Sequence, residues 1–234
     1  MRLSPYTFRD GLRDGVPIAL GYLSVSFGFG VSAAGLGLSW LQSTIISLTN
    51  VTSAGQLAGL FRMVGGATLF ETAIEQLIIN LRYALMSVSL SQKLDDSMTA
   101  PHRAAFAFVN TDEVFAMASG QKGMVGKVYL YGLILLPYLG WALGTLLGAA
   151  AGTLLPEALR MAMSIAIYGM FIAIIIPPSK KDKAVRTTVI LASLMSCVLY
   201  YVPAVSRFSV IVCAVSVSAL CAWLFPVKEE EEAE

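Results

Sequence analysis

Residues 128–155 read VYLYGLILLPYLGWALGTLLGAAAGTLL and contain no charged side chain. An α-helix needs about 20 consecutive apolar residues to cross the hydrocarbon core of a bilayer. A strand of an open sheet cannot take its place, because lipid offers the strand's backbone groups no hydrogen-bond partners. This stretch therefore predicts a transmembrane helix.

The rest of the chain has the same apolar character. Of its 234 residues, 56% are hydrophobic and 13% are charged, and the mean hydropathy is +0.72. Soluble domains carry about 25% charged residues, so this composition excludes a water-soluble fold. The formal net charge of +1 gives no basis for binding nucleic acid, or for a purely electrostatic attachment to lipid headgroups.

We predict an all-α fold, a polytopic bundle of transmembrane helices in a single domain of residues 1–226. Residues 1–15 form an amphipathic N-terminal segment, and residues 227–234 form an acidic, solvated tail. The first apolar run is too long for a signal peptide and lacks a small-residue cleavage site. The eight expected segments are Val16–Leu38, Trp40–Phe61, Met63–Leu90, Ala104–Ser119, Val128–Leu155, Ala158–Ile176, Thr188–Val202 and Phe208–Phe225.

The distribution of Lys and Arg predicts that both termini are cytoplasmic. Short cytoplasmic loops collect these residues. Eight crossings place the N-terminal arginines and the cluster from Lys180 to Arg186 on the inner side. If the fourth segment re-entered the membrane without crossing it, this bias would reverse.

A faint internal repeat links the first and fifth segments. A shift of 116 residues aligns these pairs: Ile18 with Ile134, Tyr22 with Tyr138, and Gly28 with Gly144. Transporters often carry repeats around a site at the membrane midplane. Four crossings separate the two segments, so a true repeat would be parallel. Chance similarity between two apolar helices rich in glycine and alanine is the alternative.

The third segment carries three charges, Glu71, Glu75 and Arg82. At about 100° per residue, the three side chains share one face of a helix. A charge at the helix centre costs about 2.5 to 3.5 kcal/mol on insertion scales, so this face cannot point at lipid. It forms either a salt-bridge stripe that holds helices together or the lining of a polar cavity.

The fourth segment contains Asn110, Thr111, Asp112 and Glu113 within a short apolar stretch. Two ionised acids at mid-depth would cost more than so short a segment can offset. They lie either at a helix end near the membrane surface, with an Asn or Thr cap, or against a wet cavity. Three glycines between residues 120 and 126 leave room for a hinge.

The second segment is uncharged but polar between Ser47 and Gln56. Small and hydroxyl side chains commonly hold membrane helices together. The alternative is a discontinuous helix whose freed backbone groups line a site, because irregular backbone is tolerated only where it meets protein or water.

Catalytic and metal sites find no support in the sequence. Cys197, Cys213 and Cys221 lie in apolar runs without CxxC spacing, and His102 is the sole histidine. One histidine without ligands at the right spacing does not form a zinc site, and no phosphate loop or nucleophile elbow occurs. We predict no enzymatic activity, no cofactor and no metal.

The polar stretches and their surroundings resemble the AzlC (azaleucine-resistance) type of branched-chain amino-acid exporter. The resemblance covers about residues 8–175, in the family's order. It rests on Pro17–Tyr22, Phe27–Gly30, Ala54–Leu57, Asn80–Ser87, Thr111–Ala116 and Gly140–Thr145. Two departures are Leu57, where the family usually has Phe, and Ser164, where many members have Asp.

The resemblance implies a transporter in the bacterial cytoplasmic membrane that exports leucine, isoleucine and valine, and sometimes methionine. It also implies a small membrane partner of the AzlD type. The motif residues that carry over are Gln56, Asn80, Arg82, Thr111, Asp112 and Glu113. The departure at Ser164 leaves the substrate and the coupling ion open.

Our leading hypothesis is a proton-coupled secondary exporter. Arg82 holds the substrate carboxylate, Gln56 and Asn80 supply hydrogen bonds, and Gly55 and Thr111 belong to the same substrate site. The two charged segments contain four carboxyls and one guanidinium, so we expect at least one acid to be neutral or to have a shifted pKa, and one of them to couple transport to proton entry. The candidates for this coupling are Glu71, Glu75, Asp112 and Glu113. The alternatives are a non-transporting scaffold and a channel for small zwitterions.

Overall fold

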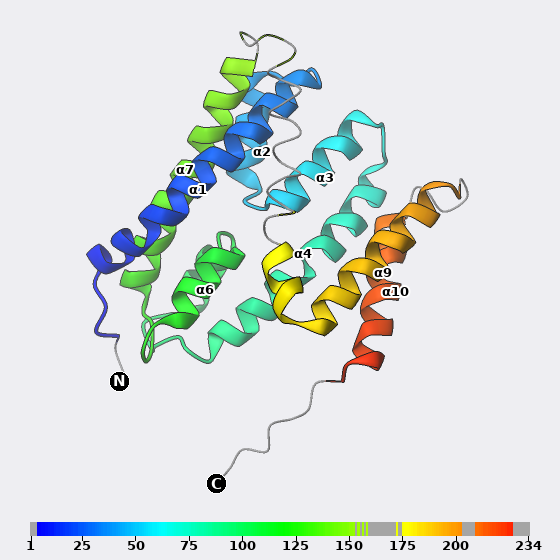
Figure 1. Cartoon of the computed structure of the whole chain (residues 1–234). Helices are drawn as coiled ribbons and strands as arrows, with labels where there is room; N and C mark the ends of the chain where they lie inside the picture. Colours follow the sequence, from blue (N-terminus) through cyan, green and yellow to red (C-terminus); the bar gives the residue numbers. More distant parts are fainter. Residues whose placement is uncertain are drawn as a thin grey trace. The chain divides into compact units, whose positions relative to one another are not determined.

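The structure is a computed structural model that describes residues 4–152, 154, 156, 158, 172, 175–202 and 209–226 (Figure 1). It divides into two compact units, Met1–Ile167 and Tyr168–Glu234. The regular secondary structure of the described residues is α-helical, apart from one isolated bridge between Leu94 and Val125, which confirms the all-α class. The prediction of one transmembrane domain stays a prediction.

Seven helices form the described part of the first unit. They are α1 (Phe8–Gly35), α2 (Trp40–Thr49), α3 (Ser53–Val64), α4 (Leu69–Ser91), α5 (Ala100–Ala107), α6 (Asp112–Gly120) and α7 (Lys127–Gly152). In the second unit, α9 (Lys183–Tyr200) and α10 (Ser209–Leu224) correspond to the last two predicted segments. The sixth predicted segment lies mostly outside the described residues, as do Ser164 and the tail 227–234.

Helices α1 and α7 are the main packing pair of the first unit, side by side over most of their length (Figure 1). They run parallel, since Gly140 meets Ala19 and Gly148 meets Phe27 further along both helices. A Cβ atom on Gly140 would lie 2.7 Å from the carbonyl oxygen of Ala19. Glycines at every fourth position from Gly140 to Gly152 thus let the two backbones touch, which is one way in which helices associate in lipid.

Three described helices, α1, α7 and α9, are long and apolar enough to cross a membrane. Helix α1 begins earlier than predicted, because Thr7 and Asp10 form a capping box. Helix α4 begins at Leu69 and not at Met63, because a turn with Gly66 at φ +69° precedes it and Thr68 caps it.

Two of the expected segments are each made of two shorter helices. The second segment is broken between α2 and α3, so the discontinuous alternative is the one observed. The fourth segment, expected over Ala104–Ser119, is likewise divided: α5 ends at Ala107, and α6 begins at Asp112 with Thr111 at its N-cap position. Polar residues at both breaks make contacts outside their own helices, which the apolar pattern does not reveal.

Both breaks meet one apolar core. Val51 from the first break and Val109 from the second are buried in the same cluster as Ile18 and Tyr22 of α1 and Trp141 of α7. The tightly packed pair α1–α7 therefore serves as the support against which both interrupted segments are held.

A cluster of polar contacts surrounds Asp95 in the loop between α4 and α5. The buried carboxylate of Asp95 accepts hydrogen bonds from the backbone N–H of Ser4 (2.7 Å) and from the N–H and hydroxyl of Ser97. Burial raises the pKa of Asp95, but these hydrogen bonds and the charge of Lys127 outweigh it and hold the pKa below its usual range. The cluster ties the N-terminal segment to the loops that precede α5 and α7.

Candidate functional site

The first break separates α2 from α3 at residues 50–52, whose backbone is extended at Asn50 and Thr52. Thr52 occupies the N-cap position of α3 without a side-chain cap hydrogen bond, and its hydroxyl donates to Oδ1 of Asn50. The first turn of α3 also contains no acid. Its N–H groups therefore present an uncompensated positive end.

Gln56 ties this break to the helix pair behind it. Its side chain is fully buried; its Nε2 donates to the hydroxyl of Ser47 (2.5 Å), and its Oε1 accepts from the indole N–H of Trp141 (2.9 Å). Ser47 in turn lies 2.6 Å from the hydroxyl of Thr145. Both ends of the Gln56 amide are thus engaged in holding α2, α3 and α7 together.

Helix α4 lies against the first turn of α3. Gln76 donates from Nε2 to the carbonyl oxygen of Gly55 (2.7 Å), and Asn80 donates to Oε1 of Gln76 (3.1 Å). A Cβ atom on Gly55 would lie 3.0 Å from Nδ2 of Asn80, so glycine is what allows this approach. The buried Oδ1 of Asn80 accepts no hydrogen bond within the described residues.

The second break lies at residues 108–111, between α5 and α6. Asn110 is 3% exposed, and its Nδ2 donates to the hydroxyl of Ser87 on α4 (3.1 Å). Its Oδ1, like that of Asn80, is buried without a partner in the part of the chain that the structure describes. A buried carbonyl oxygen without a donor is costly, so each of these two atoms is available to an N–H group of a bound molecule.

The first turn of α6 carries Asp112 and Glu113. Acids are favoured there because they complement the positive end of the helix. Asp112 forms an ion pair with Arg82, in which a guanidinium nitrogen lies 2.8 Å from Oδ2 of Asp112. Both side chains are about half exposed. Arg82 also stacks over the ring of Tyr83, with its guanidinium carbon 5.1 Å from the ring centroid.

Tyr22 of α1 connects the two breaks. Its hydroxyl lies 2.6 Å from Oε2 of Glu113 and within hydrogen-bond distance of the hydroxyl of Thr111. A tyrosine has one proton to give, so Tyr22 donates to the carboxylate and accepts from Thr111. Its ring meets Trp141 edge to face, with the centroids 5.3 Å apart. Glu113 is thereby connected to the indole that binds Gln56.

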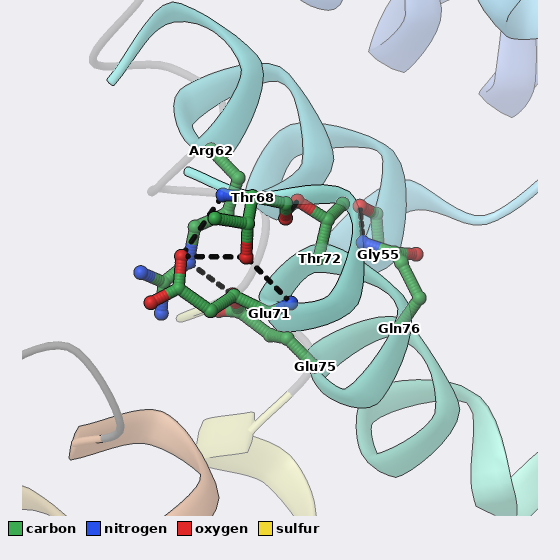
Figure 2. A network of polar contacts seen from close by, with 7 residues as sticks. All are labelled: Gly55, Arg62, Thr68, Glu71, Thr72, Glu75 and Gln76. Carbon is green, nitrogen blue, oxygen red and sulfur yellow. Dashed lines mark hydrogen bonds and ion pairs between the residues drawn. The ribbon is translucent and has the colours of Figure 1, made fainter. Parts of the chain in front are cut away.

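The three charges of α4 have different partners, although Figure 2 draws Glu71 and Glu75 in one network of polar contacts with Arg62 and Thr68. Glu71 accepts from the N–H and hydroxyl of Thr68 at the start of the helix, whereas Glu75 forms a buried ion pair with Arg62 of α3. Arg82 lies eleven residues beyond Glu71, roughly 16 Å along the axis, and pairs with Asp112. They share a face of α4, as expected, but each serves a different contact.

Middle positions of α4 therefore reach both breaks. Gln76 and Asn80 contact the start of α3, and Arg82 and Ser87 contact the start of α6. The candidate site is this part of α4 together with the two breaks. It offers an open helix N-terminus, charges of both signs and two unpaired amide oxygens, which are the partners that a small zwitterion needs.

The structure places the residues predicted for the site in two groups. Asn80 lies beside Gly55 at the start of α3, whereas Thr111, Asp112 and Glu113 begin α6, where Arg82 pairs with Asp112. Glu71 lies apart as a helix cap. Sequence reasoning did not assign Tyr22, Gln76, Ser87, Asn110 and Trp141 to the site. Each of these residues has a polar or hydrogen-bonding group within an apolar segment, and this was the signal that could have identified them.

The described residues contain no group of three His, Cys, Asp or Glu side chains that could hold a metal ion. The ring of His102 hydrogen-bonds to the hydroxyl of Tyr131 at 2.8 Å. This histidine joins α5 to α7 and lies outside the candidate site.

Comparison with known proteins identifies relatives over most of the chain. The AzlC protein family matches residues 17–155. The inner membrane protein YgaZ of Escherichia coli (strain K12) is 26% identical over 214 residues, which cover 88% of this chain and 87% of that protein. An uncharacterized membrane protein of Archaeoglobus fulgidus is 33% identical over 184 residues, with coverage of 78% and 80%. No solved structure matches the chain. The matched family range contains both breaks and all of α4.

Proposed function

The chain belongs to the AzlC family of membrane proteins, and from this premise we propose that it is a secondary transporter for branched-chain amino acids. It exports leucine, isoleucine and valine, and also the similar methionine, across the bacterial cytoplasmic membrane. Both termini are cytoplasmic in this proposal.

The observation that carries the proposal is the pair of helix breaks beside α4. A free amino acid is a zwitterion, so its site needs a group for the carboxylate and another for the ammonium. Half-helix N-termini bind anionic groups in transporters with interrupted helices. The start of α3 has no acid and no side-chain cap, whereas the start of α6 carries two acids. The two breaks thus differ in charge in the way that a zwitterion requires.

We assign the substrate carboxylate to Arg82 and to the first turn of α3 at Gly55. The guanidinium has five N–H donors, and its contacts with Asp112 and Tyr83 leave donors for a ligand. Asn80 and Thr111 supply further hydrogen bonds. Gln56 contributes by fixing the break, because both ends of its amide are already engaged.

Export against a concentration gradient needs an energy source, and we propose that proton entry supplies it. The candidate acids are Glu71, Glu75, Asp112 and Glu113. Carboxyl groups are suited to this role because a single proton changes both their charge and their hydrogen bonding.

We also propose that the transporter works with a small membrane subunit of the AzlD type. The family resemblance is the support for this partner. In the described part of α4, several large apolar side chains are exposed, including Leu69, Phe70, Leu77 and Leu85, and they need lipid or protein around them.

Leucine export is measurable in bacterial cells that lack exporters of their own. Such cells accumulate leucine when they are fed a leucine-containing dipeptide. Cells that produce this chain with its small partner are expected to hold severalfold less leucine and to release correspondingly more. The variant Arg82→Gln, produced at the same level, is expected to remove most of this effect.

Equal leucine content with and without the protein would contradict the proposed function. If Arg82→Gln changes assembly with the partner but leaves export per assembled complex unchanged, the chain is a scaffold. Release that never exceeds downhill leakage identifies a channel.

A further inference from the structure

The four candidate acids differ in the partners that the structure gives them. Glu71 is held by the Thr68 cap, Glu75 is paired with Arg62, and Asp112 is paired with Arg82. Glu71 and Glu113 both accept hydrogen bonds from neutral donors, but Glu71 caps the start of α4 outside the candidate site, whereas Glu113 accepts from the Tyr22 hydroxyl within it. Glu113 makes no ion pair within the described residues, so of the two acids at the start of α6 it is the one whose charge no cation cancels by direct contact.

We infer that Glu113 is the carboxyl that binds and releases the transported proton, an assignment that rests on the proposed function. One proton adds to a carboxylate oxygen of Glu113 from the outer aqueous side and leaves the same oxygen toward the inner side. No other covalent bond forms or breaks, and no electron is transferred.

The charges around Glu113 favour a stoichiometry of one proton. The ionisable groups that face it are Asp112 on its own helix, Arg82 and Tyr83 on α4, and Tyr22 on α1. With both tyrosines neutral, one cation and two carboxylates leave a net charge of −1. A zwitterionic substrate adds no net charge, so a single proton on Glu113 neutralises the site and lowers the cost of moving it through a low-dielectric region.

Glu113 is also accessible. Its side chain is exposed in the described first unit, and a carboxylate facing lipid at mid-depth is strongly unfavourable. Its open side therefore borders water or protein, and water there provides a route for the proton.

The contact with Tyr22 offers a way to convert protonation into movement. A hydrogen bond to a carboxylate is roughly twice as strong as one between neutral groups, so neutralising Glu113 weakens the link between α1 and α6. Helix α6 is short, and it lies between the break at residues 108–111 and a turn in which Gly123 has φ +86°. It can therefore shift against the rigid α1–α7 pair when that link weakens.

The test uses proteoliposomes that contain the full chain and its small partner. Two quantities are measured: exchange of labelled for unlabelled leucine without a gradient, and accumulation of labelled leucine driven by a pH gradient. For Glu113→Gln we expect gradient-driven accumulation to fall at least tenfold more than exchange does, because only accumulation needs the transported proton. Asp96→Asn, which changes an exposed carboxyl in the α4–α5 loop, serves as the matched control and should retain both.

A Glu113→Gln variant that still accumulates leucine under the pH gradient overturns the assignment. Loss of both activities in a variant that elutes as a folded complex also overturns it, because Glu113 would then be needed for translocation itself. Wild-type protein that neither exchanges nor accumulates leucine would contradict the proposed function itself. Failure of the Glu113 assignment is therefore distinguishable from failure of the proposed function.

A second variant keeps the assignment testable if Glu113→Gln does not fold. Tyr22→Phe removes the hydroxyl that donates to Glu113 while keeping the ring contact with Trp141. We expect it to transport leucine with a changed pH dependence of accumulation. An unchanged pH profile contradicts a role for Glu113 in proton binding.

Discussion

Glu75 and Arg62 form a buried ion pair between two helices that run antiparallel. The side chain of Glu75 is 4% exposed and that of Arg62 is 20% exposed. Removing one partner of such a pair leaves the other charge buried without compensation, which typically costs about 3 to 5 kcal/mol. The pair therefore holds α3 against α4. It lies next to the candidate site and is not part of it.

We predict that Glu75→Gln lowers the unfolding temperature of the detergent-solubilised protein by several degrees, because Arg62 loses its counter-charge. Replacing both residues by leucine should recover part of the loss, since two apolar side chains leave no buried charge. Glu71→Gln is the comparison variant, and we expect a smaller effect, because glutamine can also take the N3 position of the capping box. Thermal unfolding is the measurement, and a Glu75→Gln variant as stable as wild type contradicts the assignment.

At the level of single residues, the sequence identified which side chains are unusual but not what they contact. The charge at Glu75 and the polar group at Gln56 stand out because a membrane segment rarely carries them. Their partners, Arg62 and Trp141, come from other helices, and helical periodicity within one segment contains no information about them. Tyr22 was not assigned to the site, because the contacts of its hydroxyl with Thr111 and Glu113 depend on the fold.

Helices α1 and α7 pack closely because the glycines of α7 that face α1 carry no side chains. Gly140→Ala on α7 places a methyl group 2.7 Å from the Ala19 carbonyl oxygen, so the two backbones have to separate. Overpacking of this kind costs about 1 to 3 kcal/mol. Gly21→Ala on α1 is the matched control, because a methyl group there meets nothing within 4 Å.

The expected result is a lower unfolding temperature for Gly140→Ala and an unchanged or slightly higher one for Gly21→Ala, since alanine favours a helix over glycine. Thermal unfolding of both purified variants in the same detergent measures the difference. Equal stability of the two variants would show that the close contact of the two backbones does not hold the helices together.

The sequence was sufficient to predict the helices that are long, apolar and uninterrupted. For the interrupted segments it predicted the apolar range but not every break. Hydropathy locates α1, α7 and α9 because burial in lipid depends on composition and length. It does not locate the break at residues 108–111, because the compensating contacts of Asn110 and Thr111 come from α4 and α1. The break at residues 50–52 was one of two alternatives, favoured by a run of hydroxyl and amide side chains.

At the scale of the whole molecule, a rigid pair of helices supports two interrupted segments beside α4. Helices α1 and α7 run parallel, as a parallel repeat requires, and the repeat itself stays a prediction. Their interface is made of close backbone contacts, whereas α4 and α6 add polar contacts, and α6 also buries Val114 and Ala118 in the apolar core. In transporters with alternating access, one bundle rocks against another around a fixed site, and the polar contacts of α4 and α6 are the ones that such a movement would exchange.

The central claim is that the starts of α3 and α6, together with the middle of α4, form one amino-acid site. Binding of labelled leucine to the purified complex in detergent tests it most directly. Gly55→Leu fills the space between α3 and the side chains of Gln76 and Asn80, and Gly21→Ala again serves as the control outside the site.

We predict saturable leucine binding by wild type and by Gly21→Ala, with competition by isoleucine and valine. We expect Gly55→Leu to bind at least tenfold more weakly while eluting as a folded complex in gel filtration. Leucine binding of equal strength by Gly55→Leu, or no binding by wild type, would contradict the account.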